Sequence, residues 1–350
     1  MKVLRSTLAC VVFLSMMNTA CAQVGKVTVV VTDHESGEPL SGVIALMGFV
    51  TTHGMESGPE NDSECTTDSV GKCSVWGYGN GGSATVVVMD SPEYYGAWET
   101  IEYFRNGAGS IAKPWNPTIQ LRLKKKRNPI PMYAMKLSQK RFPEEVLPEG
   151  YDPKKQDWIE MPADSGTVAW DLEKGDWVEP YGKGEIADFI FKIHREARKK
   201  YVGDSWGHEY LSSGATVEVT VSNEGDGFIP YPVPEKDRHR GLRMPYEAPA
   251  DGYMPTVTKY FTHPKDGTGK ANLRKDMNYF FQVRTVRDQS GKIISALYGK
   301  IYGEFLIHSF GNDISFTYYL NPTPNDRNVE FKVKSNLFSD LIGTKDPYEP

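Results

Sequence analysis

Apolar side chains recur at every second position in several short stretches, which is the pattern of β-strands with one buried face. The positions between them are mostly polar, as at Thr216, Glu218 and Thr220. The apolar sets are Val27, Val29 and Val31; Ile119, Leu121 and Leu123; Phe189, Phe191 and Ile193; Val217, Val219 and Val221; and Ile314, Phe316, Tyr318 and Leu320. Only residues 194–201 and 335–342 favour short helices. We therefore predict an all-β fold.

Turn residues and prolines divide the chain. Two long apolar runs, 279–286 and 293–307, flank the turn sequence Asp288–Gly291, which predicts a hairpin. Prolines are dense between residues 126 and 160, which favours a stiff, extended connector. We predict two β-sandwich domains, at residues 25–125 and 161–345, with a proline-rich linker at residues 126–160 and a long loop at residues 223–272. Long loops of this kind often carry function, so we expect this one at the rim of any site.

Residues 1–22 have the three parts of a secretion signal. Lys2 and Arg5 supply positive charge, an apolar run follows, and small residues end the segment at Ala22. Cleavage there would release a secreted or periplasmic protein. Alternatively, residues 18–21 resemble a lipobox with Asn18 where leucine is usual, and Cys21 would then carry a lipid anchor. No later stretch is apolar enough for long enough to form a transmembrane segment.

Two cysteines remain in the predicted mature chain once Cys10 and Cys21 are set aside. Cys65 and Cys73 flank a turn sequence that contains Asp68 and Gly71. Strands that leave such a turn bring their Cβ atoms within disulfide reach, and an oxidising compartment allows the bond. The alternative is a metal site, but two cysteines without a nearby histidine supply half of one at most.

The first domain carries a recognisable order of turns and strands. The strand at residues 26–33 leads into Ser36–Val43, then Thr67–Lys72, and the region ends at the strand of residues 119–123. This order resembles the carboxypeptidase regulatory-like domain, a transthyretin-like β-sandwich, over residues 25–125. The resemblance implies a fold and a stabilising or adaptor role, and it brings no catalytic residues. A polar insertion at residues 51–64 departs from the simplest pattern.

Charge and motifs exclude several classes of function. Without Lys2 and Arg5 the chain has 38 basic and 45 acidic residues, a formal charge of −7 that argues against nucleic acid as a partner. Residues 77–82 satisfy G-x-G-x-x-G, but a strand follows them where a dinucleotide site needs a helix. No nucleophile elbow, P-loop or zinc-protease motif is present. We expect no cofactor and no metal, and the separated histidines His194, His208 and His308 are expected at the surface or in caps.

Acidic residues gather around two tryptophans at the start of the second domain. Asp171, Glu173, Asp176 and Glu179 lie close in sequence to Trp170 and Trp177. Two carboxylates about 5–10 Å apart would suit glycoside hydrolysis. Acidic residues are abundant throughout the chain, however, and spacing alone singles out no pair.

A second pattern concerns tyrosines in the long run at residues 293–307. Leu297, Ile301 and Phe305 are expected on one face of that strand. Tyr298, Lys300, Tyr302 and Glu304 are expected on the other, wetter face. Tyrosines four apart on one strand face, beside charged groups, can stack on sugar rings and bond hydroxyls, and Trp170 and Trp177 extend the aromatic set. The alternative is that these rings pack against a second layer.

These observations favour an exported, non-enzymatic protein for binding or for assembly of the cell envelope. A glycan is the favoured ligand and an envelope protein the other expected partner. Two alternatives remain: an exported glycoside hydrolase that uses the carboxylates of residues 171–179, and a purely structural component of the envelope.

Overall fold

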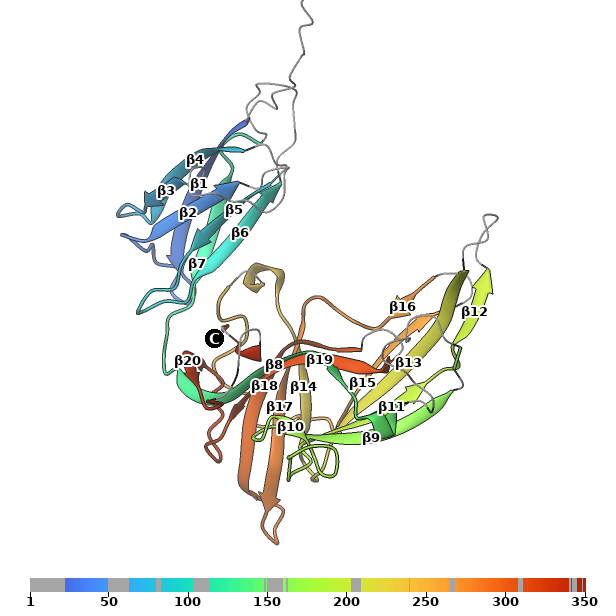
Figure 1. The fold of residues 1–350 in the computed structure, drawn as a ribbon. Coiled ribbons are helices and arrows are strands. Elements are labelled where there is room, and N and C mark those ends of the chain that lie inside the picture. The colour runs from blue at the N-terminus through green and yellow to red at the C-terminus, as the bar shows by residue number, and fades with distance from the viewer. Residues whose placement is uncertain are drawn as a thin grey trace, which may run out of the picture. The chain divides into compact units, whose positions relative to one another are not determined.

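The computed structural model describes most of the chain, and its residues form two compact units. The described residues are 23–49, 63–79, 83–102, 114–147, 149, 160–161, 163–202, 209–238, 240–264, 268–307, 311–339, 341, 345–347 and 349–350. Unit 1 takes in residues up to 91 together with 96–124, and unit 2 takes in residues 92–95 and 125–350. Figure 1 shows both units as assemblies of strands. The predicted secretion signal and most of the 51–64 insertion lie outside the described residues.

Unit 1 is a sandwich of two small sheets (Figure 1). Its strands are β1 (Gln23–Asp33), β2 (Ile44–Phe49), β3 (Ser63–Thr66), β4 (Lys72–Gly79), β5 (Ser83–Val88), β6 (Ala97–Glu102) and β7 (Thr118–Leu123). One sheet has the order β4-β1-β7, and the other has the order β3-β2-β5-β6. The predicted alternation is confirmed, because Val27, Val29 and Val31 are fully buried. Burial of such side chains between two sheets is the main stabilising term of this unit.

The predicted disulfide is confirmed. Cys65 in β3 and Cys73 in β4 are bonded, with Cα atoms 5.9 Å apart. The turn that precedes β4 is closed by the Asp68 carboxylate, which accepts the N–H groups of Val70 and Lys72. Gly71 has φ of +70°, a value that glycine adopts without strain. Because β3 and β4 are edge strands of different sheets, the bond joins the two halves of the sandwich.

Unit 2 is a larger sandwich (Figure 1). Its first sheet, in the order β10-β9-β11-β13-β15-β16 with β12 also paired to β13, contains β9 (Asp164–Asp171), β10 (Asp176–Trp177), β11 (Phe189–Arg195), β12 (Lys199–Val202), β13 (Glu209–Val221), β15 (Thr256–His263) and β16 (Lys270–Ala271). Its second sheet, in the order β14-β17-β18-β19-β8-β20, contains β8 (Ile130–Arg141), β14 (Gly227–Pro232), β17 (Met277–Arg287), β18 (Ile293–Ile307), β19 (Asp313–Asn321) and β20 (Phe331–Asn336). Two 3-10 turns, η1 (Glu144–Val146) and η2 (Glu235–Asp237), are the helical elements among the described residues.

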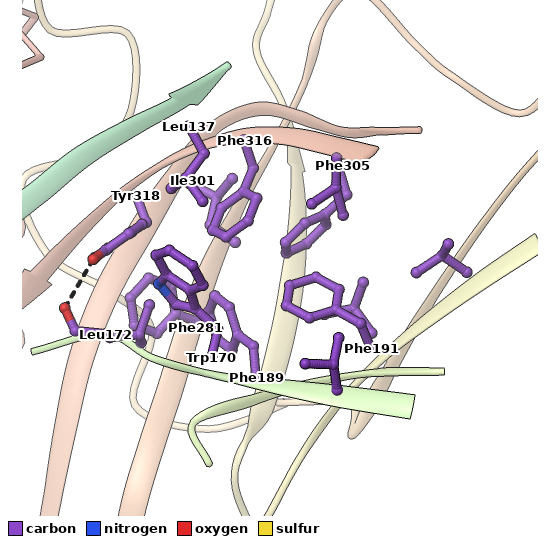
Figure 2. Packing of buried hydrophobic residues seen from close by; sticks show 14 of the residues in the cluster. Leu137, Trp170, Leu172, Phe189, Phe191, Phe281, Ile301, Phe305, Phe316 and Tyr318 are labelled. Atoms are coloured by element: carbon purple, nitrogen blue, oxygen red, sulfur yellow. Dashed lines mark hydrogen bonds between the residues drawn. The ribbon is translucent and has the colours of Figure 1, made fainter. Parts of the chain in front are cut away.

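Aromatic side chains fill the space between these two sheets. Figure 2 shows Phe189 and Phe191 meeting Phe281, Phe305 and Phe316 from the facing sheet. Ring centroids lie 5.2 Å apart for Phe189 and Phe281 and 5.3 Å apart for Phe305 and Phe316, within the range of favourable aromatic pairs. The all-β class and the predicted inward sets of these strands are confirmed. Leu297, Ile301 and Phe305 also belong to this core, as predicted.

The predicted linker at residues 126–160 is wrong in its first half. Residues 130–141 form β8, which pairs antiparallel with β19 and parallel with β20. Met132 and Ala134 are buried on one side of the sheet, and Leu137 is buried on the other. Burial on both faces removes the strict alternation that the sequence analysis required of a strand. Residues 148 and 150–159 lie outside the described residues.

The long loop predicted at residues 223–272 is also interrupted by structure. It contains β14, β15 and β16, and the stretch that remains irregular runs mainly from residue 240 to residue 254. The two predicted helices are wrong, because residues 194–195 end β11, residues 199–201 belong to β12, and residues 335–336 end β20. None of the helices formed by the described residues has the length and apolar content needed to cross a bilayer.

Candidate functional site

Trp170 and Trp177 lie inside the unit 2 core rather than on its surface. Their rings meet edge to face, with centroids 4.9 Å apart, and their exposed fractions are 1% and 3%. Figure 2 shows the Trp170 ring among the phenylalanines of both sheets. These rings stabilise the fold and present no face to a sugar, so the expectation that they extend a binding platform is wrong.

Tyr298, Lys300 and Tyr302 share one face of β18, as predicted, but that face is not wet. Their exposed fractions are 5%, 0% and 6%. A second apolar cluster covers them, made of residues from 244–248 and 329–331 packed on Phe280 and Tyr319 of neighbouring strands. Backbone hydrogen bonds between residues 246–248 and 327–329 hold this cover together. The expectation of exposed tyrosines is wrong because both faces of the six-stranded sheet are buried.

Glu304 has different surroundings from the other three predicted residues. Its carboxylate accepts a hydrogen bond of 2.6 Å from the Tyr279 hydroxyl and pairs with Lys259 Nζ at 2.6 Å. Lys259 belongs to β15 of the facing sheet, so this nearly buried ion pair joins the two sheets. Burial, followed by the bond to Glu304, raises the pKa of Tyr279. The register of β18 shifts between Tyr302 and Leu306, so simple alternation does not extend to Glu304.

A cluster of cations and tyrosines occupies the covered face. Lys300 Nζ lies 3.2 Å from the Tyr302 hydroxyl, 4.5 Å from the Tyr302 ring centroid and 4.8 Å from that of Tyr319. The Arg243 guanidinium lies over the Tyr302 ring, 4.6 Å from its centroid. Burial raises the pKa of both tyrosines, so their hydroxyls remain hydrogen-bond donors at neutral pH.

A cavity of about 170 Å³ opens beside this cluster. The sheet contributes Lys136, Tyr302, Thr317 and Tyr319 to its wall. Arg243, Pro347 and Glu349 complete the wall from the covering segments. The cavity therefore combines cationic, hydroxyl and aromatic groups, and we take it as the candidate binding site.

The carboxylates proposed for hydrolysis are engaged in structural contacts. Asp171 is 1% exposed, and it accepts N–H groups from Glu173, Lys174, Glu185 and Ile186. Burial alone would raise the pKa of Asp171, but these donors and the charge of Arg284 outweigh it and lower the pKa. Arg284 also binds Glu173, at 2.6 Å. The Asp176 carboxylate accepts the N–H groups of Trp177 and Lys183.

Of the three histidines weighed as metal ligands, only His194 is among the described residues. It is exposed, as predicted, and its Nδ1 lies 2.9 Å from the Ser165 hydroxyl. Within the described ranges, no three of the histidine, cysteine, aspartate and glutamate side chains are grouped to hold a metal ion.

Two arginines have roles that the sequence analysis did not assign. Arg243 appeared there only as part of an irregular loop, and Arg284 only as part of a long apolar run. A charged residue inside an apolar run indicates a buried ion pair, since buried charges are nearly always paired. The partners, Glu349 for Arg243 and Asp188 for Arg284, are about 100 residues distant in sequence and could not be named from it.

No family model matches the chain, and no curated protein is similar to it in sequence. Solved structures with local similarity include pilins. The streptococcal ancillary pilin aligns with 54% of this chain at 11% identity and a TM-score of 0.21, and the alignment spans 58% of that pilin. The shaft pilin SpaA of Lactobacillus rhamnosus GG aligns with 59% of this chain and 90% of its own length, at 12% identity and a TM-score of 0.19. BcpA, the major pilin subunit of Bacillus cereus, aligns with 88% of this chain and 97% of its own length, at 11% identity and a TM-score of 0.20. At these values the alignments carry no argument, and the β-sandwich assignment rests on the strand pairing and burial described above.

Proposed function

We propose that this chain is an exported protein of the periplasm or cell surface that works by binding and assembly. The observation that carries the proposal is the disulfide between Cys65 and Cys73. Structural disulfides form and persist in oxidising compartments and are rare in the cytosol. The bond thus supports export, in agreement with the secretion signal expected at residues 1–22.

The arrangement of charged groups supports a binding role over a hydrolytic one. The carboxylates of Asp171, Asp188 and Glu304 are all buried, and each is paired with a cation. A general acid or base must reach its substrate, and these groups are held inside the sandwich. The cavity beside Tyr302 instead offers donors and cations, and the carboxylate in its lining, Glu349, is paired with Arg243.

Cell fractionation with thiol trapping tests export. The full chain, expressed in a bacterial host, should appear outside the cytoplasm, with Cys65 and Cys73 resistant to maleimide until a reductant is added. The Leu14→Arg variant, which breaks the apolar run of the signal, should remain in the cytoplasm with both thiols reactive. A wild-type chain that stays in the cytoplasm in reduced form would refute the proposal.

Membrane attachment is tested by the Cys21→Ser variant in the same fractions. If the signal is simply removed, wild type and variant are both soluble after export. If Cys21 carries a lipid, wild type is in the membrane fraction and labelled palmitate is incorporated, and the substitution abolishes both.

Glycan binding needs exposed rings, and two half-exposed tryptophans of unit 1 meet that need. Trp76 in β4 is 52% exposed, and Trp115, just before β7, is 49% exposed. We propose these two residues as the glycan contacts in place of the buried tyrosines. On a glycan array, Trp76→Ala and Trp115→Ala should each lower retention at least tenfold, whereas Tyr298→Phe should leave it unchanged. Equal retention by all variants would refute this assignment.

A further inference from the structure

The described residues of the last part of the chain, 345–347 and 349–350, lie against the face of the six-stranded sheet that carries Tyr302. Arg243 pairs with Glu349, and the Tyr302 hydroxyl donates to the main-chain oxygen of Pro350. Asn336 Nδ2 donates to Asp346 at 2.9 Å. Pro347 and Pro350 are buried in this arrangement. The segment is therefore held by two acidic side chains and two prolines, the features of a peptide ligand.

The surface that receives the segment belongs to the sheet and its cover. Lys300 is fully buried between Phe280 of β17 and Tyr319 of β19, with its ammonium group against two tyrosine rings. Lys136 and Arg243 add positive charge at the cavity wall. A cationic pocket with aromatic walls attracts carboxylates strongly, because the low dielectric of its surroundings weakens screening. Asp346 and Glu349 supply the complementary charge.

The segment does not fill this surface. A cavity of about 170 Å³, partly open to solvent, remains beside Glu349 and Pro347. Arg243 Nε is buried and has no hydrogen-bond partner in the part of the chain that the structure describes. A buried donor without a partner is unfavourable, because it has given up its hydrogen bonds to water. The fit of the segment is therefore incomplete, which favours exchange.

We propose that this cavity is a binding site for acidic, proline-flanked peptides and that a second copy of this chain can supply the ligand through its own residues 345–350. In an isolated copy the site is occupied in cis. In an assembly the same contacts join one copy to the next. This inference rests on the proposed role in binding and assembly, and it names the partner.

A titration with a labelled peptide of residues 343–350 tests the site directly. The receptor is the full chain with Asp346→Asn and Glu349→Gln, which weaken the cis segment while leaving unchanged the part of the wall that the sheet and Arg243 contribute. This released chain should bind the peptide at least tenfold more tightly than wild type, because the wild-type segment competes at high effective concentration. Adding Arg243→Met should lower the affinity at least tenfold through loss of the charge-assisted contact. Fluorescence anisotropy at two salt concentrations gives the affinities.

Arg238→Met in the released chain is the matched control, since Arg238 belongs to the same loop but pairs with Asp276 at 3.8 Å outside the cavity wall. It should leave peptide affinity unchanged. A peptide with Glu349→Gln should bind at least fivefold more weakly. The proposal would be overturned if the released and wild-type chains bound the peptide with equal affinity. It would also be overturned if Arg243→Met left the affinity of the released chain unchanged. Because purified protein is used, failure here is distinct from failure of export, which fractionation reports.

Discussion

Replacing Arg284 with methionine should remove the charge that holds three carboxylates together at the edge of the unit 2 core. Arg284 donates to both oxygens of Asp188, at 2.8 Å each, and to Asp171 at 3.2 Å and Glu173 at 2.6 Å. Asp171 and Asp188 are each 1% exposed. Loss of one partner of a buried ion pair costs about 3–5 kcal/mol, because the remaining charge stays buried without compensation. Asp171 keeps its N–H donors, so Asp188 accounts for most of the loss.

The pH dependence of this loss follows from the Asp188 carboxyl. Burial raises the pKa of Asp188, and Arg284 opposes that rise without cancelling it. A raised folded pKa contributes stability that is present below the unfolded value of about 3.9 and is lost as pH rises through the folded pKa. Without Arg284 the folded pKa rises further. The free energy of unfolding of Arg284→Met should therefore fall further below wild type at pH 7 than at pH 5.

Urea unfolding at pH 5 and pH 7 measures the free energy of unfolding of both chains, and the fluorescence of the buried Trp170 and Trp177 reports on unit 2. Arg284 has φ of +56°, and methionine bears the same backbone strain, so the comparison isolates the side chain. Arg287→Met, an exposed arginine on the same strand, is the matched control and should change stability by no more than about 0.5 kcal/mol. Adding Asp188→Asn to Arg284→Met should restore more than half of the loss. A loss below about 1 kcal/mol, or an equal loss at both pH values, would refute the reasoning.

Further substitutions test three other parts of the fold by thermal or urea unfolding. Cys65→Ser should lower the stability of unit 1 by about 2–3 kcal/mol, and reduction of the wild type should reproduce that loss. Lys259→Met should lower the free energy of unfolding by about 3–5 kcal/mol, because Glu304 then stays buried without its cation. Adding Glu304→Gln should recover part of that loss, and a double variant in which the two single losses simply add would contradict the reasoning. Gly299→Ala should cost about 3 kcal/mol, since its Cβ would overlap a phenylalanine ring and a carbonyl of the adjacent strands. Gly291→Ala, at a turn with open space, should cost only about 1–2 kcal/mol for its φ of +82°; equal losses at the two glycines would be inconsistent with overlap.

The sequence by itself determined the class of the fold and the inward faces of most strands. Val217, Val219 and Val221 alternate with Thr216, Glu218 and Thr220, which is the pattern of a strand with one buried face. The Cys65–Cys73 bond was also predictable, because both partners flank a single turn. Each of these features depends on residues that are close in sequence.

Only the tertiary structure decided what covers the other face of the second sheet. Tyr298 and Tyr302 have the spacing of exposed tyrosines, yet residues 244–248 and 329–331 bury them. The tertiary structure also decided that residues 130–141 form β8, because its partner β20 lies about 200 residues later in the chain. A strand buried on both faces loses its alternation, and a pairing between distant segments has no local pattern. For the same reason the cationic cavity, with Lys136, Arg243 and Glu349 in its wall, could be found only once the chain was folded.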